Sequence, residues 1–235
     1  MSVVRLTLDQ QKEVIASYQS GLADEIDAGG LYARNPTAHK WKVTYRTIIL
    51  RELVAWRFCD IMNQVLLLES NEHFLGSRLL LRSAIETLSL LIYSSEKMEC
   101  IVRTGDGFHE YSKKSTRLLL GTKLANTKFQ AINIIEVLEK ASKEHPELKI
   151  AYDDLSETAH PNFDGLFRTY GSPSDSGMLT TFSNQSSHLY SSQQAALISL
   201  LLVAFETEYN FRWDKAFNNF ENWIEKNDRK LEDTQ

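Results

Sequence analysis

Residues 80–93, LLRSAIETLSLLIY, decide the fold because they form a helical pattern that is apolar around most of its circumference. Such a helix is stable in water only where other helices cover it. Apolar residues recur at helical spacing through most of the 235 residues, and only 10 Gly and 4 Pro interrupt them. The sequence therefore predicts an all-α protein, an up-down helical bundle of about five to seven helices.

Start and stop signals place these helices. Thr7-Leu8-Asp9-Gln10 has the form of a capping box, and Gly29-Gly30 would end the first helix. Pro146 stands at the favoured first position of a later helix, which Pro161 stops directly after His160. The other helices are expected at about residues 39–70, 74–99, 108–120, 129–143 and 192–226.

Residues 162–190 differ from the rest because they are rich in Ser, Thr, Gly and Asp. Two short candidate strands, Leu166–Tyr170 and Met178–Phe182, predict a small β-hairpin near residues 165–183. An insertion of this length is either a lid or partner surface, or a plain connector. We expect one domain over residues 1–235, with this insertion and a flexible charged tail at 228–235.

Composition limits the class of protein. A formal charge of -5 gives no overall attraction to nucleic acid or anionic membranes, and no DNA-binding motif is present. Cys59 and Cys100 form no CxxC pair, which argues against a disulfide framework or structural zinc and favours the cytoplasm. Residues 1–5 do not start like a signal peptide, and the apolar run Ala195–Phe205 is too short to span a membrane.

Two polar segments are the candidate site. Arg82 and Glu86 lie on the otherwise apolar helix, where a charge must be paired to be tolerated. Ser156, Glu157 and His160 follow one another along the flank of the Pro146 helix. We expect the two segments to meet in a polar pocket. The alternative is an interior salt bridge that only fixes helix register.

A metal site and a serine nucleophile are the chemistries open at this pocket. Glu157-x-x-His160 has the spacing of di-iron bundles, but the sequence holds no second such pair, which disfavours a di-iron centre. A single metal on His160, Glu157 and Glu86 is the other metal site that stays open. Ser156 lacks the elbow and oxyanion loop of a serine nucleophile. The first half of the 39–70 helix is basic and contains Trp41 and Trp56, so it could bind RNA through charge and base stacking. The alternative is that both tryptophans belong to the core and the cations face solvent. We expect no cofactor.

The segments Leu81–Glu86 and Tyr152–Pro161 resemble uncharacterised bacterial helical proteins near the HEPN superfamily, whose members include RNases of toxin–antitoxin and antiphage systems. The likeness covers about residues 78–171. It implies a homodimer in which a histidine, here His160, acts with an arginine on RNA. The arginine that catalytic members carry shortly before the histidine is missing, so Arg82 would have to replace it.

Three functions follow as hypotheses, and whether the chain is an enzyme stays open. The first is an HEPN-like homodimer that binds or cleaves RNA or a nucleotide with Arg82, Glu86, Ser156, Glu157 and His160. In cleavage, His160 would be the general acid or base and Arg82 would stabilise phosphate charge. The second is a non-enzymatic interaction protein of the same fold. The third is a carboxylate–histidine metal-binding bundle.

Overall fold

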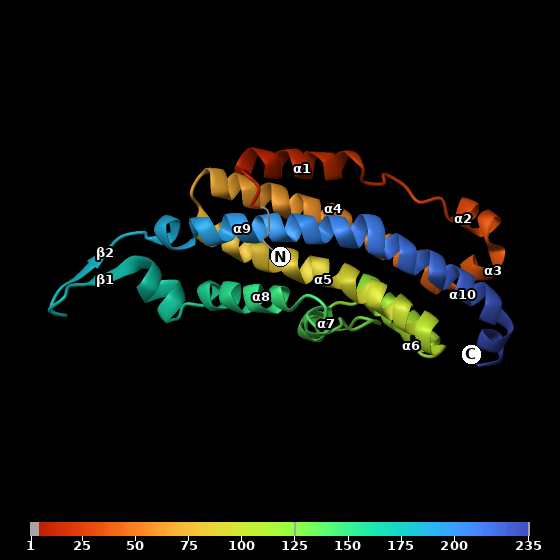
Figure 1. Ribbon diagram of the computed structural model, residues 1–235. Coiled ribbons are helices and arrows are strands. Elements are labelled where there is room, and N and C mark those ends of the chain that lie inside the picture. Colours follow the sequence, from red (N-terminus) through yellow and green to blue (C-terminus); the bar gives the residue numbers. More distant parts are fainter. Residues whose placement is uncertain (1–4, 125, 235) are drawn as a thin grey trace. The chain divides into compact units, whose positions relative to one another are not determined.

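The structure is a computed structural model that describes residues 5–124 and 126–234. It is mostly helical with one small antiparallel hairpin, which confirms the predicted class (Figure 1). The described residues form ten α-helices, more than the five to seven expected, because several pieces are short. Residues 1–4, on which the signal-peptide prediction mostly rests, lie outside the described residues. So does position 235 of the predicted tail.

The chain packs into two compact units, and each draws on separate stretches of sequence. The first comprises the described parts of Met1–Gly21, Arg57–Thr87 and His145–Phe205. The second comprises Leu22–Trp56, Leu88–Glu144 and the described part of Glu206–Gln235. Long helices therefore supply residues to both units, and the expectation of a single domain over residues 1–235 stays a prediction.

In the first unit, α1 (Leu8–Ser20) packs on α9 (Ser186–Glu206). The predicted capping box is confirmed, since Thr7 Oγ1 accepts from Gln10 N and Thr7 N donates to Gln10 Oε1 at 2.8 Å. Gln11, which is buried, donates to Ser199 Oγ at 3.1 Å, and Tyr18 stacks obliquely on Phe205. A polar anchor and an aromatic contact thus hold α1 in place.

The core of the first unit is completed by parts of α4 (Lys42–Ser70) and α5 (Phe74–Thr104), and by α8 (Pro146–Ala159). Phe58 of α4 stacks on Phe205 at 4.3 Å between ring centroids. Pro146 occupies the first turn of α8, as predicted. The buried apolar side chains contributed by α4, α5, α8 and α9 include Phe58, Met62, Val65, Leu81, Ala84, Ile85, Leu148, Leu155, Ile198, Leu201, Leu202 and Phe205.

The hairpin is confirmed, but its first strand lies later than predicted. Strand β1 (Gly171–Pro173) pairs antiparallel with β2 (Thr180–Phe182), while most of the expected strand Leu166–Tyr170 belongs to a π-helix, η1 (Phe163–Arg168). Local side-chain bonds explain the difference. Asn162 caps η1 through Gly165 N at 3.0 Å, and Asp164 pairs with Arg168 at 3.0 Å.

The second unit contains α2 (Ala28–Arg34), α3 (Pro36–His39), α6 (Phe108–Leu120), α7 (Ile134–Ala141), η2 (Thr207–Arg212) and α10 (Trp213–Asp233). Phe108 and Tyr111 of α6 lie against Phe220 of α10. The Tyr111 hydroxyl is buried between Thr47 at 3.3 Å and Ser94 at 2.7 Å. These contacts form an aromatic core with one satisfied polar group.

Several helix boundaries differ from the predictions. Gly29-Gly30 does not end the first helix, which stops at Gly21; the pair lies inside α2, where a Cβ at Gly30 would come within 2.5 Å of Asp27. Helix α7 begins only after Asn133, which caps Ile135 N. Helix α10 continues to Asp233, so most of the expected tail 228–235 is helical.

The helix Ser186–Asp233 is long and apolar enough to cross a membrane by length and composition alone, a weak signal that buried core helices also give.

Candidate functional site

Arg82 and Glu86 of α5 meet α8 inside the first unit, as expected, and Arg82 makes most of the contacts. Its Nε donates to Ser156 Oγ at 2.9 Å, and its Nη2 donates to Tyr152 Oη at 2.5 Å. The guanidinium carbon lies 4.7 Å from the centre of the Tyr152 ring. Three bonds and contacts from one helix therefore fix the plane of the guanidinium.

Tyr152 also belongs to this cluster, which the sequence analysis did not predict. It lies among the apolar residues of α8 and is only 4% exposed. Its hydroxyl, however, donates to Glu86 Oε1 at 2.9 Å while accepting from Arg82. Burial raises the pKa of Tyr152, and the hydrogen bond to Glu86 raises it further, so the phenol stays protonated at neutral pH.

The Ser156 hydroxyl is hydrogen-bonded to Tyr152 on its own helix and to Arg82 on α5. It donates to the Tyr152 carbonyl at 2.7 Å, one helical turn earlier, and accepts from Arg82 Nε. A serine hydroxyl has a single proton, and here that proton is used by the backbone. Ser156 therefore positions Arg82 and has no base beside it that could make it a nucleophile.

Glu157 and His160 do not join the cluster. Helix α8 ends at Ala159, and His160 follows it in an extended conformation with φ -87 and ψ 146, so its side chain does not continue the flank of Ser156. Both side chains are exposed. Glu157 Oε2 accepts from Asn162 Nδ2 at 2.7 Å, and no hydrogen bond of the His160 ring occurs within the described residues. The structure thus unites Arg82, Glu86 and Ser156 only.

The chain just after His160 is held tightly by Gly165. A Cβ at this position would lie 2.0 Å from the carbonyl oxygen of His160 and 2.8 Å from that of Thr158. Only glycine permits so close an approach of the two backbones. The backbone at His160 is consequently fixed, although its imidazole is exposed.

A second polar cluster lies one turn before Arg82, and it too was not foreseen. Arg78 is 2% exposed, donates to Asp154 Oδ2 at 2.6 Å and Thr158 Oγ1 at 2.8 Å, and lies 4.3 Å from the Tyr190 ring centre. Beside it, Glu69 accepts from Ser77 at 2.5 Å and from Gln194. Burial raises the pKa of Glu69.

Acidic side chains outnumber basic ones around these clusters. On α8 and on residues 74–87 of α5, the basic residues are Arg78, Arg82 and Lys149, and the acidic residues are Glu86, Glu147, Asp153, Asp154 and Glu157. A long polyanion would meet net repulsion here, whereas a ligand with one or two phosphates could be held by Arg82 alone.

The basic half of α4, in the second unit, is not an open RNA face. Lys40 pairs with Asp228 and Glu232 at 2.6 Å each, and Arg51 pairs with Glu52 at 2.6 Å. Trp56 is 48% exposed rather than buried, but its indole N–H donates to a backbone carbonyl, that of Ala23. Lys40 and Arg51 are thus neutralised within the unit, whereas Lys42 and Arg46 form no ion pair among the described residues.

No protein-family model, curated protein or solved structure matches this chain. Its own geometry also limits the metal hypothesis, because Glu86 is bonded to Tyr152 whereas Glu157 and His160 lie in solvent. Within residues 5–124 and 126–234, no group of three or more His, Cys, Asp or Glu side chains is placed to hold a metal ion.

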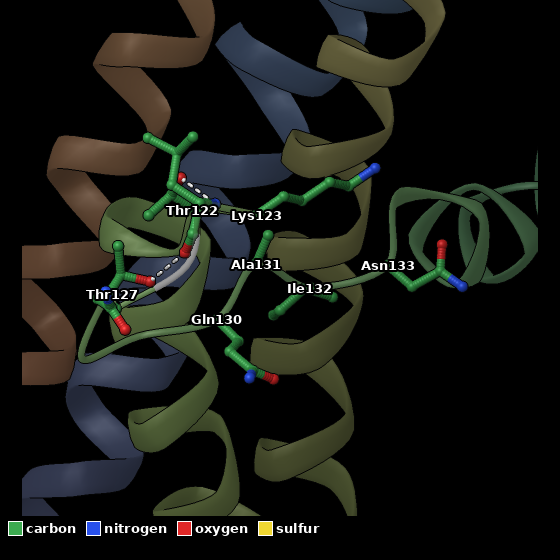
Figure 2. Close-up of a pocket in the computed structure, with 9 residues that line it drawn as sticks. Thr122, Lys123, Thr127, Gln130, Ala131, Ile132 and Asn133 are labelled. Atoms are coloured by element: carbon green, nitrogen blue, oxygen red, sulfur yellow. Dashed lines mark hydrogen bonds between the residues drawn. The ribbon is translucent and has the colours of Figure 1, made fainter.

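Two cavities have linings that differ from the Arg82 cluster. One of about 490 Å³, in the second unit, is shown in Figure 2, and Thr122 and Thr127 in its wall bond to the backbone of Leu124. Its lining residues are Thr122, Lys123, Leu124, Asn126, Thr127, Gln130, Ala131, Ile132 and Asn133. Its only charged lining residue is Lys123. The other, of about 380 Å³, lies in the first unit beside Arg78 and Gln194. The first cavity has no acidic lining residue, and in the second Arg78 is already paired with Asp154. At Arg82, Nη2 lies 3.6 Å from Glu86 Oε1, and Nη1 has no hydrogen-bond partner among the described residues.

Proposed function

We propose that the chain is an HEPN-like up-down helical bundle that binds a short phosphate-bearing ligand, a nucleotide or a segment of RNA, at Arg82. One observation carries the proposal. Ser156 and Tyr152 fix Nε and Nη2 of the guanidinium, while Nη1 has no hydrogen-bond partner among the described residues and the side chain is 37% exposed. A fixed guanidinium with a free edge suits a phosphate, because little side-chain entropy is lost on binding.

Binding is better supported than cleavage. Cleavage would need an acid or base beside the phosphate, and the exposed His160 is the only histidine of the predicted site. No hydrogen bond joins it to Arg82 within the described residues, and no neighbour orients its ring. A cytoplasmic homodimer with a toxin–antitoxin or antiphage role belongs to the same proposal and rests on the family resemblance.

The test compares two arginines of the first unit. Binding of ATP, GTP and a short fluorescein-labelled RNA is measured by calorimetry and fluorescence polarisation for the wild type, Arg82→Gln and Arg57→Gln. Arg57 is a matched control, because it is exposed and donates only to Ser83 and Thr87 on α5. We expect Arg82→Gln to weaken binding about 10-fold or more and Arg57→Gln to change it little. Equal affinities for the two variants, or no binding by the wild type, would refute the proposal.

A parallel assay separates binding from cleavage. RNA is incubated with the wild type and with His160→Ala, whose exposed side chain makes a folding defect improbable on physical grounds. RNA that stays intact with both proteins supports a binding role. RNA that is cut by the wild type and not by the variant would establish His160 as the acid or base.

The second candidate function is a non-enzymatic interaction protein. It is favoured by the internal bonding of the cluster, since the hydroxyls of Tyr152 and Ser156 each both donate and accept within the protein. In that case Arg82→Gln lowers stability without changing any ligand affinity, and the Arg82 comparison above distinguishes the two functions.

A further inference from the structure

The π-helix η1 and the hairpin carry large apolar side chains that are exposed to solvent. Phe163 is 66% exposed, Phe182 is 80% exposed and Phe167 is 42% exposed. Met178 and Leu179, in the hairpin loop, are also exposed. In Figure 1 the hairpin projects beyond the ends of α8 and α9 of the same unit. Exposed apolar surface of this extent on a soluble chain generally marks a contact site.

Three of these rings form one continuous surface, the aromatic patch of Phe163, Phe167 and Phe182. Phe163 and Phe167 are stacked, with ring centroids 5.8 Å apart. The Phe167 ring lies over Gly171, because a Cβ built there would be 3.2 Å from its Cδ2. Gly171 is paired directly with Phe182, and paired residues of antiparallel strands point to the same face. Phe182 therefore projects from the face that Phe167 covers.

Charge limits what can cover this patch. From Pro161 to Gln185 the only charged residues are Asp164, Arg168 and Asp175, and the first two pair with each other at 3.0 Å. A surface without lysine and with one arginine that is already paired does not suit nucleic acid or an anionic membrane. Each copy carries only the net charge of Asp175 here, so two copies brought face to face meet little charge repulsion.

The exposed apolar area of this region is comparable to the area that one partner buries in a protein–protein interface. The three rings expose roughly 400 Å², about half of the ~800 Å² that each partner contributes to a standard interface. Met178, Leu179 and Leu166 can supply much of the remainder. The patch together with these three side chains is therefore large enough for a weak to moderate dimer.

We propose that the aromatic patch is the interface through which two copies of this chain form a two-fold dimer, with the patch of each copy packed on that of the other. This proposal rests on the homodimer of the proposed function and gives it an interface, but it does not depend on phosphate binding at Arg82. In such an isologous contact each substitution acts twice, so one change in the patch alters both sides of the interface.

The test is sedimentation equilibrium of the full chain from low to high micromolar concentration. We expect the wild type to dimerise, Phe163→Ser/Phe182→Ser to raise the dimer Kd at least about 10-fold, and Phe182→Lys to do the same by placing two like charges in the contact. Leu67→Ser is the matched control, because Leu67 is 64% exposed on α4 of the same unit but outside the patch. Circular dichroism checks that each variant is folded.

Each outcome decides the proposal. A wild type that is monomeric at the highest concentration overturns it, whatever other molecule the patch binds. A dimer that survives both patch variants, or that Leu67→Ser weakens as strongly, also overturns it. If the double variant fails to fold, Phe182→Lys alone gives the answer, since its side chain is in solvent in the monomer.

Discussion

The hydroxyl of Tyr152 accepts a hydrogen bond from Arg82 Nη2 at 2.5 Å and donates one to Glu86 Oε1 at 2.9 Å. We predict that Tyr152→Phe lowers the free energy of unfolding by about 1–2 kcal/mol, because both charged partners lose a bond at a nearly buried site. Urea denaturation measures the change. Tyr32→Phe is the control, since Tyr32 is 53% exposed, and should stay within about 0.5 kcal/mol of the wild type.

Arg78 should matter more for stability than Arg82. Its side chain is 2% exposed and fills space between α8 and the Tyr190 ring, whereas that of Arg82 is 37% exposed. We predict that Arg78→Ala costs about 3 kcal/mol through lost packing and bonds, and Arg82→Ala about 1–2 kcal/mol. Thermal unfolding of the two variants side by side checks the order. A smaller loss for Arg78→Ala would contradict the burial argument.

Glu69 gives the chain a defined pH dependence. Burial raises its pKa in the folded protein above the ordinary value of 4.5, so the folded state binds the proton more tightly than the unfolded state. The contribution of Glu69 to stability is then full below the ordinary pKa and falls as the pH rises through the folded pKa. We predict that Glu69→Gln, which can still accept from Ser77 and Gln194, gains stability relative to the wild type as the pH rises through this window.

Denaturation from acid to neutral pH checks this prediction, and the stability difference between Glu69→Gln and the wild type should grow with pH. Parallel curves for Glu69→Gln and the wild type would mean that burial does not govern this carboxyl group.

The two thiols should react at different rates. Cys59 is 1% exposed, and burial raises its pKa to about 11, so little thiolate forms at neutral pH. Cys100 is partly exposed. We predict that iodoacetamide modifies Cys100 first in the native protein and Cys59 only after unfolding, as followed by mass spectrometry. Equal rates in the native state would show that α4 opens locally at Cys59.

Gly165 should not tolerate a side chain. Gly165→Ala would force its Cβ to within 2.0 Å of the His160 carbonyl oxygen, and we predict a loss of about 2 kcal/mol or more as α8 and η1 separate. Gly21→Ala is the control, because its Cβ would lie 3.6 Å from the nearest atom, an ordinary contact. Thermal unfolding distinguishes the two.

Much of the helical order could be predicted because its signals are local. Gly107 and Gly121 flank α6, which begins and ends at the predicted residues, and Pro146 marks the start of α8. The predicted helix end at Gly29-Gly30 was wrong. A glycine pair marks a helix end only where the backbone must turn, and here the missing Cβ atoms leave room for the Asp27 side chain. The π-helix η1 depends on the Asn162 cap and the Asp164–Arg168 pair, which no apolar periodicity reveals.

The candidate site was predictable only in part. A charge on an otherwise apolar helix needs a partner, and by that rule the sequence predicted that Arg82 and Glu86 meet α8, as they do, although both are partly exposed. The sequence did not identify Tyr152 as the residue that bonds both charges. Tyrosine has an apolar ring and a polar hydroxyl, and a position among apolar residues indicates only the ring's burial. His160 was assigned to the helical flank, but a proline directly after it makes the extended conformation the favoured one.

The hydroxyl proton of Ser156 points along its own helix to the carbonyl of Tyr152. An electrophile such as a fluorophosphonate would therefore meet an alcohol of ordinary reactivity at this position, without a base to draw the proton away. In activity-based profiling of a cell extract, the chain should pass unlabelled among the serine hydrolases, even where it is abundant.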